Sequence, residues 1–408
     1  MIKQLKSDIK CIVVDYTSVC VNSSLDEITE YVIEILSEIG YDKKKHLFSR
    51  FIRQLIAESS PEIYGSNYNN FILNDNSSIV KYLETIPQYE QRSPEWYAAR
   101  KNSIGASESA TIFGLNPYET ENKLILKKCG VVNEADIKRM KVVCEHGVKY
   151  EPIIQDMYCR DKSTTIKEFG SIPHSDPNLS IVTASPDGIT PEGCMLEIKA
   201  PAKRIITGIP PAYYWTQCQQ QMQVCNLEKV DFLEVKIEEY TNIDDYILDN
   251  KDGDIESPFT EDGFEKNVII EYHKLDSDSN LGYIYPNKLL NTSEIKEWKD
   301  NIEKELEKTD NKQFRRLSYW KCKQYCLTEI YKDQEWWDNN VDKFGIFWKK
   351  VEHYRNVGHQ SLLPKKRSQY IPKLNNCLIQ SDDEDNNPQK IKSNNLNNES
   401  CMILSDED

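Results

Sequence analysis

The spacing of hydrophobic positions changes several times along the chain, and the first part has the spacing of helices. In residues 25–40, apolar side chains recur every three or four positions and the run ends at Gly40, which predicts an amphipathic helix with a glycine cap. The stretch "HLFSRFIRQLIAES" repeats this spacing. Because neither stretch carries a catalytic constellation, we expect residues 1–86 to form a helical region that packs or binds a partner.

After residue 87 the pattern is mixed. The runs "LSIVTASP", "CMLEIKAP" and "KVDFLEVKIEEY" are typical of strands, and helical stretches separate them. The runs "KNVIIEYHKL" and "LGYIYPNKLL" predict two further strands. This alternation predicts an α/β (α+β) fold in which a central mixed sheet is flanked by helices, with its core in residues 87–290.

The last part of the chain has two patterns. Residues 291–370 are rich in aromatic side chains and predict a helical part packed on the core, in which the tryptophans fill the interior. Residues 371–408 lose the hydrophobic period and are rich in Asn, Asp and Ser, which predicts a disordered acidic tail. Between them, "LPKKR" is either a solvated linker, which we favour, or a nuclear signal.

Charge restricts how this chain could bind a nucleic acid. The formal net charge over 408 residues is −15, of which −6 falls in residues 381–408 and −9 in the rest. Such a body could bind DNA only through a local basic groove. The first ten residues do not resemble a secretory signal, and no apolar run approaches the ~18 residues of a membrane span. We therefore expect reduced thiols, an intracellular location and no membrane partner.

The stretch "SPDGITPEGCMLEIKA" carries the first candidate chemistry. On a strand, Glu197 and Lys199 share one face, and a hairpin would bring Asp187 beside Glu197. Two adjacent carboxylates repel each other unless a divalent cation lies between them, and oxygen ligands suit Mg²⁺ or Mn²⁺. Taken alone, the same pattern also fits a surface hairpin with an ordinary Glu–Lys pair.

Two predicted helices supply possible neighbours for this cluster. On "CEHGVKYEPIIQDMY", Glu151 lies beside the apolar stripe and could face the sheet. The helix in "PPAYYWTQCQQQMQVCN" begins after two prolines, and Gln217 and Gln221 flank its apolar stripe. The apolar stripe consists of Trp215, Cys218, Met222 and Cys225. We expect Gln219, Gln220 and Gln223 on the polar surface of the helix.

A third stretch, "RSPEWYAARKNSIGASESATIFGLNPY", has the features of an anion site. Its small, hydroxyl-rich segment 105–110 could open a helix whose free N–H groups accept an anion. Arg100, seven residues before Ser107, could add a fixed charge for phosphate.

Together these motifs carry a resemblance. "EWYAARKNSIGASE", "HGVKYE", "SPDG", "LEIKAP" and "YYWTQCQ" follow one another as in the YqaJ-like viral recombinase family, which includes the lambda-type exonucleases of the PD-(D/E)xK nuclease superfamily. The resemblance extends from about Gln88 to Lys236. It implies a restriction-endonuclease-like PD-(D/E)xK core and a large DNA virus as the source.

The resemblance also implies roles for individual residues. Lys199 resembles the lysine that orients or activates the attacking water and stabilises the pentavalent phosphate, and Gln217 resembles the active-site glutamine. Gly105 departs from the lambda-type pattern, which has a hydroxyl residue there. The implied Mg²⁺ ligands are Glu151, Asp187, Glu197 and the main-chain carbonyl of Ile198, and the implied pocket for a terminal 5′-phosphate consists of Arg100, Ser107 and Ser185.

The function implied is a metal-dependent 5′-to-3′ exonuclease on linear double-stranded DNA, with Mg²⁺ as cofactor and Mn²⁺ as its substitute. The single strand produced would serve viral recombination or repair, with a single-strand annealing protein as partner, a homo-oligomer as one assembly, and the host cytoplasm rather than the nucleus as location. The alternatives are an endonuclease or an RNA-degrading relative that uses the same site, or a non-catalytic DNA-binding scaffold with a nuclease fold.

Overall fold

The computed structural model describes residues 9–14, 16, 25–38, 56, 76–89, 91, 93–131, 134–275 and 281–363. The predicted tail 371–408, the Gly40 cap and most of the second N-terminal helix lie outside these residues. Within them, the helix expected after residue 25 is confirmed as α2 (Leu25–Glu38). None of the described helices combines the length and the apolar character that crossing a membrane requires.

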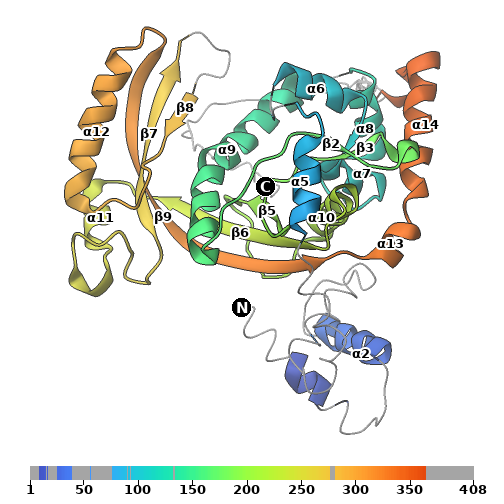
Figure 1. Ribbon diagram of the computed structural model, residues 1–408, viewed down its shortest axis with the longest axis horizontal. Helices are drawn as coiled ribbons and strands as arrows, with labels where there is room; N and C mark the ends of the chain where they lie inside the picture. Colours follow the sequence, from blue (N-terminus) through green and yellow to red (C-terminus); the bar gives the residue numbers. More distant parts are fainter. Residues whose placement is uncertain are drawn as a thin grey trace, which may run out of the picture.

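The main sheet confirms the mixed α/β fold predicted from the strand-type runs (Figure 1). Its strand order is β4-β5-β6-β9-β7-β8, in which β5 and β6 are parallel and the other neighbours are antiparallel. All five predicted runs contain strands. The main sheet also contains two strands outside these runs, and the bounds of all its strands are β4 (Gly188–Ile189), β5 (Met195–Lys199), β6 (Lys229–Glu239), β7 (Lys266–Lys274), β8 (Leu281–Ile284) and β9 (Lys312–Tyr331).

The strand β9 corrects the expectation that residues 291–370 are helical. It pairs with β7 through residues 312–321 and with β6 through residues 320–331, so it forms the middle of the sheet (Figure 1). The reason lies in a period of two that the density of aromatic residues obscured. Alternate side chains face the interior along the second half of the strand, and the buried ones are Ser318, Trp320, Cys322, Cys326, Thr328 and Ile330.

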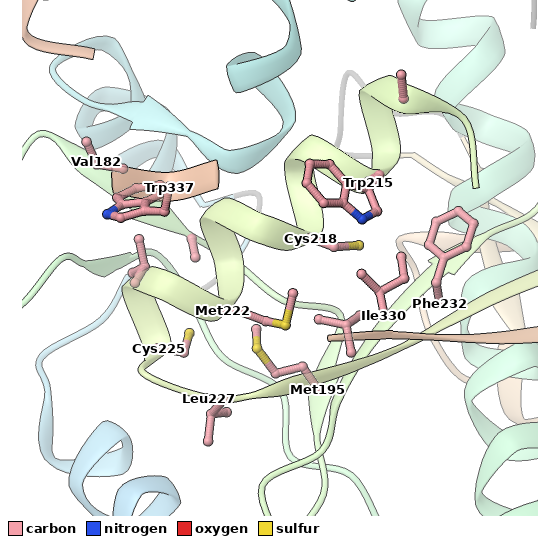
Figure 2. Packing of buried hydrophobic residues seen from close by; sticks show 14 of the residues in the cluster. Val182, Met195, Trp215, Cys218, Met222, Cys225, Leu227, Phe232, Ile330 and Trp337 are labelled. Atoms are coloured by element: carbon pink, nitrogen blue, oxygen red, sulfur yellow. The ribbon is translucent and has the colours of Figure 1, made fainter. Parts of the chain in front are cut away.

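The second, smaller sheet is joined to the main sheet by one helix. It has the order β1-β3-β2, with bounds β1 (Ile104–Gly105), β3 (Val182–Ala184) and β2 (Ile172–Pro173). Helix α10 (Ala212–Cys225) contacts both β3 and β6. Figure 2 shows the predicted apolar stripe of α10 packed between Met195 of β5, Ile330 of β9 and Trp337, which confirms that stripe.

The two faces of β5 pack against different parts of the protein. Met195 belongs to the core under α10, whereas Leu196 and Ile198 pack with Ile154 and Tyr158 of α9 (Glu134–Lys162). This is the alternation expected of the strand. Because both faces are covered, Glu197 on the α10 side is only 1% exposed, and its carboxylate must find partners inside the protein.

The remaining helices surround these layers (Figure 1). Helix α12 (Thr292–Glu307) packs on β9, and α14 (Asp342–Val357) packs on α7 (Ser109–Ile112) and α8 (Glu121–Lys128). Trp320 and Trp337 are buried, and Trp298, Trp336 and Trp348 are partly buried against the core, as expected of interior tryptophans. The bounds are α5 (Ser77–Thr85), α6 (Pro94–Lys101), α7 (Ser109–Ile112), α8 (Glu121–Lys128), α11 (Ile243–Leu248), α12 (Thr292–Glu307), α13 (Gln334–Asp338) and α14 (Asp342–Val357).

Candidate active site

The predicted hairpin of Asp187 and Glu197 is confirmed. Strand β4 pairs with β5 so that Gly188 faces Leu196, and Gly193 makes the turn with φ +86°. This conformation is easily reached only by glycine. Asp187 precedes β4 directly, and its Oδ2 accepts a hydrogen bond of 2.7 Å from the N–H of Ile198. The carboxylate of Asp187 is thereby fixed at the end of β5.

The carboxylate of Glu197 is buried and accepts hydrogen bonds at both oxygens. Its Oε1 accepts from Lys199 Nζ at 2.5 Å and from Gln217 Nε2 at 2.6 Å. Its Oε2 accepts from Gln221 Nε2 at 2.6 Å. The structure thus brings the predicted Glu197, Lys199 and Gln217 together and adds Gln221, whose spacing of four residues from Gln217 places both amides on one face of α10.

Asp187 experiences the negative charge of both other candidate carboxylates. Burial raises the pKa of Asp187 well above its usual range, and the charges of Glu197 and Glu151 raise it further, whereas Lys199 and the N–H of Ile198 act in the opposite direction. The backbone oxygen of Asp187 also accepts a hydrogen bond of 3.0 Å from Gln155 of α9. Glu151, one turn before Gln155, therefore belongs to the same electrostatic cluster.

Lys199 is held as a cation beside Glu197. Burial lowers the pKa of Lys199, but the neighbouring Glu197, Tyr214 and Asp187 outweigh this effect and raise the pKa above its usual value. The ammonium also lies 4.7 Å from the ring centroid of Tyr214, and the guanidinium of Arg204 lies 5.5 Å from that same centroid. We did not predict Tyr214 or Arg204 as part of this site. The only sequence signal was the position of Tyr214 within the "YYWTQCQ" motif.

The three predicted phosphate-binding residues are linked through Trp96. The guanidinium of Arg100 lies 4.4 Å from the Trp96 ring centroid and donates a hydrogen bond of 3.1 Å to Ser107 Oγ. On the other side, Trp96 Nε1 donates to Ser185 Oγ at 3.4 Å. Ser185 lies two residues before Asp187, so this chain of contacts leads from the exposed Ser107 to the carboxylates.

The segment 105–110 differs from the expected anion-binding helix terminus. It forms a short 3₁₀ turn (Ala106–Glu108) followed by the four-residue α7, and the N–H of Gly105 donates to Glu108 Oε2 at 2.9 Å. Glu108 is 3% exposed and pairs with Lys128 Nζ at 2.7 Å. This N–H is therefore occupied by a carboxylate of the chain itself, because Glu108 folds back to cap the turn.

The expectation of a polar surface for Gln219 and Gln220 is wrong. Both side chains are fully buried, because α10 lies between the small sheet and the main sheet. Gln219 Nε2 donates to the backbone oxygen of Tyr331 at 2.9 Å, and Gln220 Nε2 donates to the backbone oxygens of Ile104 and Thr183 at 2.9 Å. Gln223 is half-buried and binds Gln334. The amides of Gln219 and Gln220 connect α10 to the backbone of β9, β1 and β3.

Comparison with known proteins places this site in a known domain. Residues 95–228 match the YqaJ-like viral recombinase domain, a range that contains every candidate site residue. An uncharacterized protein of Acanthamoeba polyphaga mimivirus is 30% identical over 316 residues, covering 69% of this chain and 56% of that protein. A protein of African swine fever virus is 25% identical over 171 residues, covering 35% of this chain and 48% of the relative.

The chain thus spans about half the length of these viral relatives. Among solved structures, it is similar to an alkaline exonuclease from Laribacter hongkongensis, with 18% identity, a TM-score of 0.36, and coverage of 65% of this chain and 95% of that one. The resemblance inferred from the five motifs is confirmed by the domain match. The chain carries a YqaJ-like viral recombinase domain in residues 95–228 and has relatives in large DNA viruses.

Proposed function

We propose that the protein is a metal-dependent deoxyribonuclease that digests linear double-stranded DNA from the 5′ end. The observation that supports this most is the buried carboxylate of Glu197, which binds Lys199, Gln217 and Gln221 directly beside Asp187. Burying an acid and a lysine on one strand costs free energy because both lose their hydration. Such a pair is therefore more typical of a functional site than of an ordinary core strand. The match to the YqaJ-like viral recombinase domain also supports a reaction on DNA, because recombination is a process of DNA.

The oxygen donors at this site fit a divalent cation. Among the described residues, no group of three or more His, Cys, Asp or Glu side chains is arranged so that it could hold a metal ion. However, the repulsion that Glu197 and Glu151 exert on Asp187 is the penalty that such an ion would remove. We propose Asp187, Glu197, Glu151 and the carbonyl of Ile198 as ligands of Mg²⁺, with Mn²⁺ as a substitute. When bound, the ion supplies Lewis-acid chemistry and neutralises charge on the phosphate.

The side chains around the ion site would each act on the substrate. Lys199, as a cation, donates to the phosphate oxygens that gain negative charge in the transition state. Lys199 would also orient or activate the attacking water, and Gln217 orients the carboxylate of Glu197. Arg100, Ser107 and Ser185 bind the terminal 5′-phosphate, for which a guanidinium offers two parallel donors. Binding at the terminus would make the enzyme an exonuclease and would set its 5′-to-3′ direction.

The test uses linear duplexes labelled at the 5′ or the 3′ end and covalently closed circles, each with Mg²⁺, Mn²⁺ or EDTA. We expect metal-dependent release of 5′-terminal nucleotides from the linear duplex, faster with a 5′-phosphate than with a 5′-hydroxyl, and no cutting of circles. Equal cutting of circles would indicate an endonuclease, and cutting of RNA alone would indicate an RNA-degrading relative. Binding without cutting under all conditions would favour a scaffold.

We also propose a partner, a location and an assembly for the protein. The single strand that remains after digestion is a substrate for annealing, so we propose a single-strand annealing protein as partner in viral recombination or repair. We propose that the protein acts inside the host cell, in the cytoplasm, because its relatives belong to large DNA viruses. A homo-oligomer around the duplex would make digestion processive, and gel filtration with light scattering measures its size.

A further inference from the structure

A continuous run of aromatic rings leads from the lysine of the site to the protein surface. Lys199 Nζ contacts the ring of Tyr214, whose centroid is 4.3 Å from that of Tyr213. The Tyr213 ring in turn meets that of Tyr118 edge-on, at 6.0 Å and 82°. On the interior side, Tyr214 packs on Phe232 of the core at 5.7 Å. Tyr213 and Tyr214 are half-buried, whereas Tyr118 is 48% exposed.

The exposed Tyr118 lies in a loop whose residues are joined to one another by side-chain hydrogen bonds. Its own N–H donates to Asn116 Oδ1 at 2.9 Å, and Asn116 Nδ2 donates to Thr111 Oγ1 at 2.9 Å. Thr111 Oγ1 then donates to Glu119 Oε2 at 3.3 Å. These hydrogen bonds hold the backbone that carries the ring, and the ring itself packs on Tyr213. An exposed tyrosine kept in a defined position offers a rigid apolar face at low entropic cost.

Two observations connect this run to a nucleic-acid strand. The loop follows α7 directly, so Tyr118 comes eleven residues after Ser107 of the proposed phosphate pocket. At its other end, the run carries two cations, Lys199 and Arg204, on the ring of Tyr214. Proteins that hold single strands without sequence preference combine cations that bind the backbone with aromatic rings on which the bases stack.

We propose that Tyr118, supported by Tyr213, is a stacking platform for a nucleobase near the 5′ end of the strand being digested. The inference rests on the proposed nuclease function and adds a base-binding subsite to it. Stacking would hold the terminal nucleotide out of the duplex while its 5′-phosphate lies in the proposed pocket of Arg100, Ser107 and Ser185 and the phosphodiester on its 3′ side lies beside Lys199. Because every base has an aromatic face, the platform would accept all four bases.

The experiment is a double-mutant cycle between Tyr118 and the base. Wild-type protein, Tyr118→Ala and Tyr118→Phe digest 5′-phosphorylated duplexes that carry an abasic residue at the first, second or third position, or none. For Tyr118→Ala we expect kcat/KM on the intact duplex to fall by about 5-fold to 150-fold, the range that base–aromatic stacking supplies. At one abasic position the variant and the wild type should become nearly equal, and Tyr118→Phe should behave as the wild type.

The cycle separates stacking from a structural role. If Tyr118 only supported the fold, Tyr118→Ala would lower kcat/KM by the same factor on intact and abasic duplexes, and this result would overturn the inference. Tyr82→Ala, which removes a tyrosine 58% exposed on α5, is the matched control and should leave every duplex unaffected. Failure of the wild type to digest any duplex would refute the nuclease proposal itself, which is a distinct outcome.

Discussion

Gln221 Nε2 donates a hydrogen bond of 2.6 Å to Glu197 Oε2, the oxygen opposite the one that Gln217 and Lys199 contact. Glu197 is 1% exposed and receives these three donors from one neighbouring helix and its own strand. A carboxylate that is held at both oxygens keeps one orientation, which a metal ligand requires. The second amide is therefore as much part of the site as the first.

We predict that Gln221→Ala lowers kcat on linear duplex DNA by about 10-fold to 100-fold, the usual effect of losing a residue that orients a ligand. Loss of the amide leaves Glu197 Oε2 without this donor, so that only the two donors at Oε1 still orient the carboxylate. Gln223→Ala on the same helix, where the side chain binds Gln334, is the control and should leave kcat unchanged. Equal effects of the two substitutions would contradict this role of Gln221.

We predict that Lys199→Ala abolishes cleavage while binding of DNA persists. The substitution removes the cation beside Glu197 that would stabilise the charge developing on the phosphate. Cleavage of labelled duplex and fluorescence anisotropy measure the two properties separately. Lys203→Ala, which removes an exposed lysine of the following loop, should keep both. If Lys199→Ala lost binding and cleavage together with its thermal transition, misfolding would explain the result.

We predict that Lys128 and Lys127 differ sharply although both contact Glu108. Lys128 Nζ lies 2.7 Å from the carboxylate and is 2% exposed, whereas Lys127 Nζ lies 3.5 Å away and is 42% exposed. Lys128→Met should lower the free energy of unfolding by about 3 kcal/mol, because it leaves a buried charge without its main partner. Lys127→Ala should lower it by less than about 1 kcal/mol.

Urea unfolding of both variants measures this difference. Lys128 Nζ also donates to the backbone oxygen of Arg100 at 2.7 Å, so Lys128→Met should additionally weaken the preference for a 5′-phosphate over a 5′-hydroxyl. If the two lysine variants lost equal stability, the buried Glu108–Lys128 pair would contribute no more to the free energy of unfolding than the exposed Lys127 does.

We predict that Glu271 makes the protein sensitive to acid. Burial alone would raise the pKa of Glu271, but hydrogen bonds from Arg316 and Lys149 outweigh it and lower the pKa to about 2. Because the unfolded value of 4.5 is higher, the stabilisation is complete above about pH 4.5 and is lost as the pH falls towards 2. Allowing for solvent screening at the exposed arginines, the loss should amount to about 1 to 2 kcal/mol.

Unfolding free energies measured between pH 6 and pH 3 test this prediction, since Glu271→Gln should flatten that part of the profile. Glu297→Gln changes an exposed carboxylate of α12 and serves as the control, with the wild-type profile expected. A profile for Glu271→Gln as steep as that of the wild type would show that other groups cause the acid sensitivity.

Gln219, Gln220 and strand β9 differ from the sequence predictions for the same physical reason. A one-dimensional period shows which side of an element is apolar, but it does not show whether a second layer covers the polar side. Gln219 and Gln220 were assigned to the surface, yet they are buried because α10 has a sheet on each side. In residues 312–331, the density of aromatic residues favours a helix, whereas the structure buries alternate side chains of a strand from Ser318 to Ile330.

The sequence alone determined the mixed α/β class, the Asp187–Glu197 hairpin, the face shared by Glu197 and Lys199, and the resemblance of residues 95–228 to the YqaJ-like viral recombinase domain, because these depend on local periods and on motif order. Only the tertiary structure decided that Trp96 joins Arg100 to Ser185, that Gln221 completes the partners of Glu197, and that Tyr118 meets Tyr213. These contacts join segments far apart in the chain or depend on how a helix is rotated, and packing of the layers sets both.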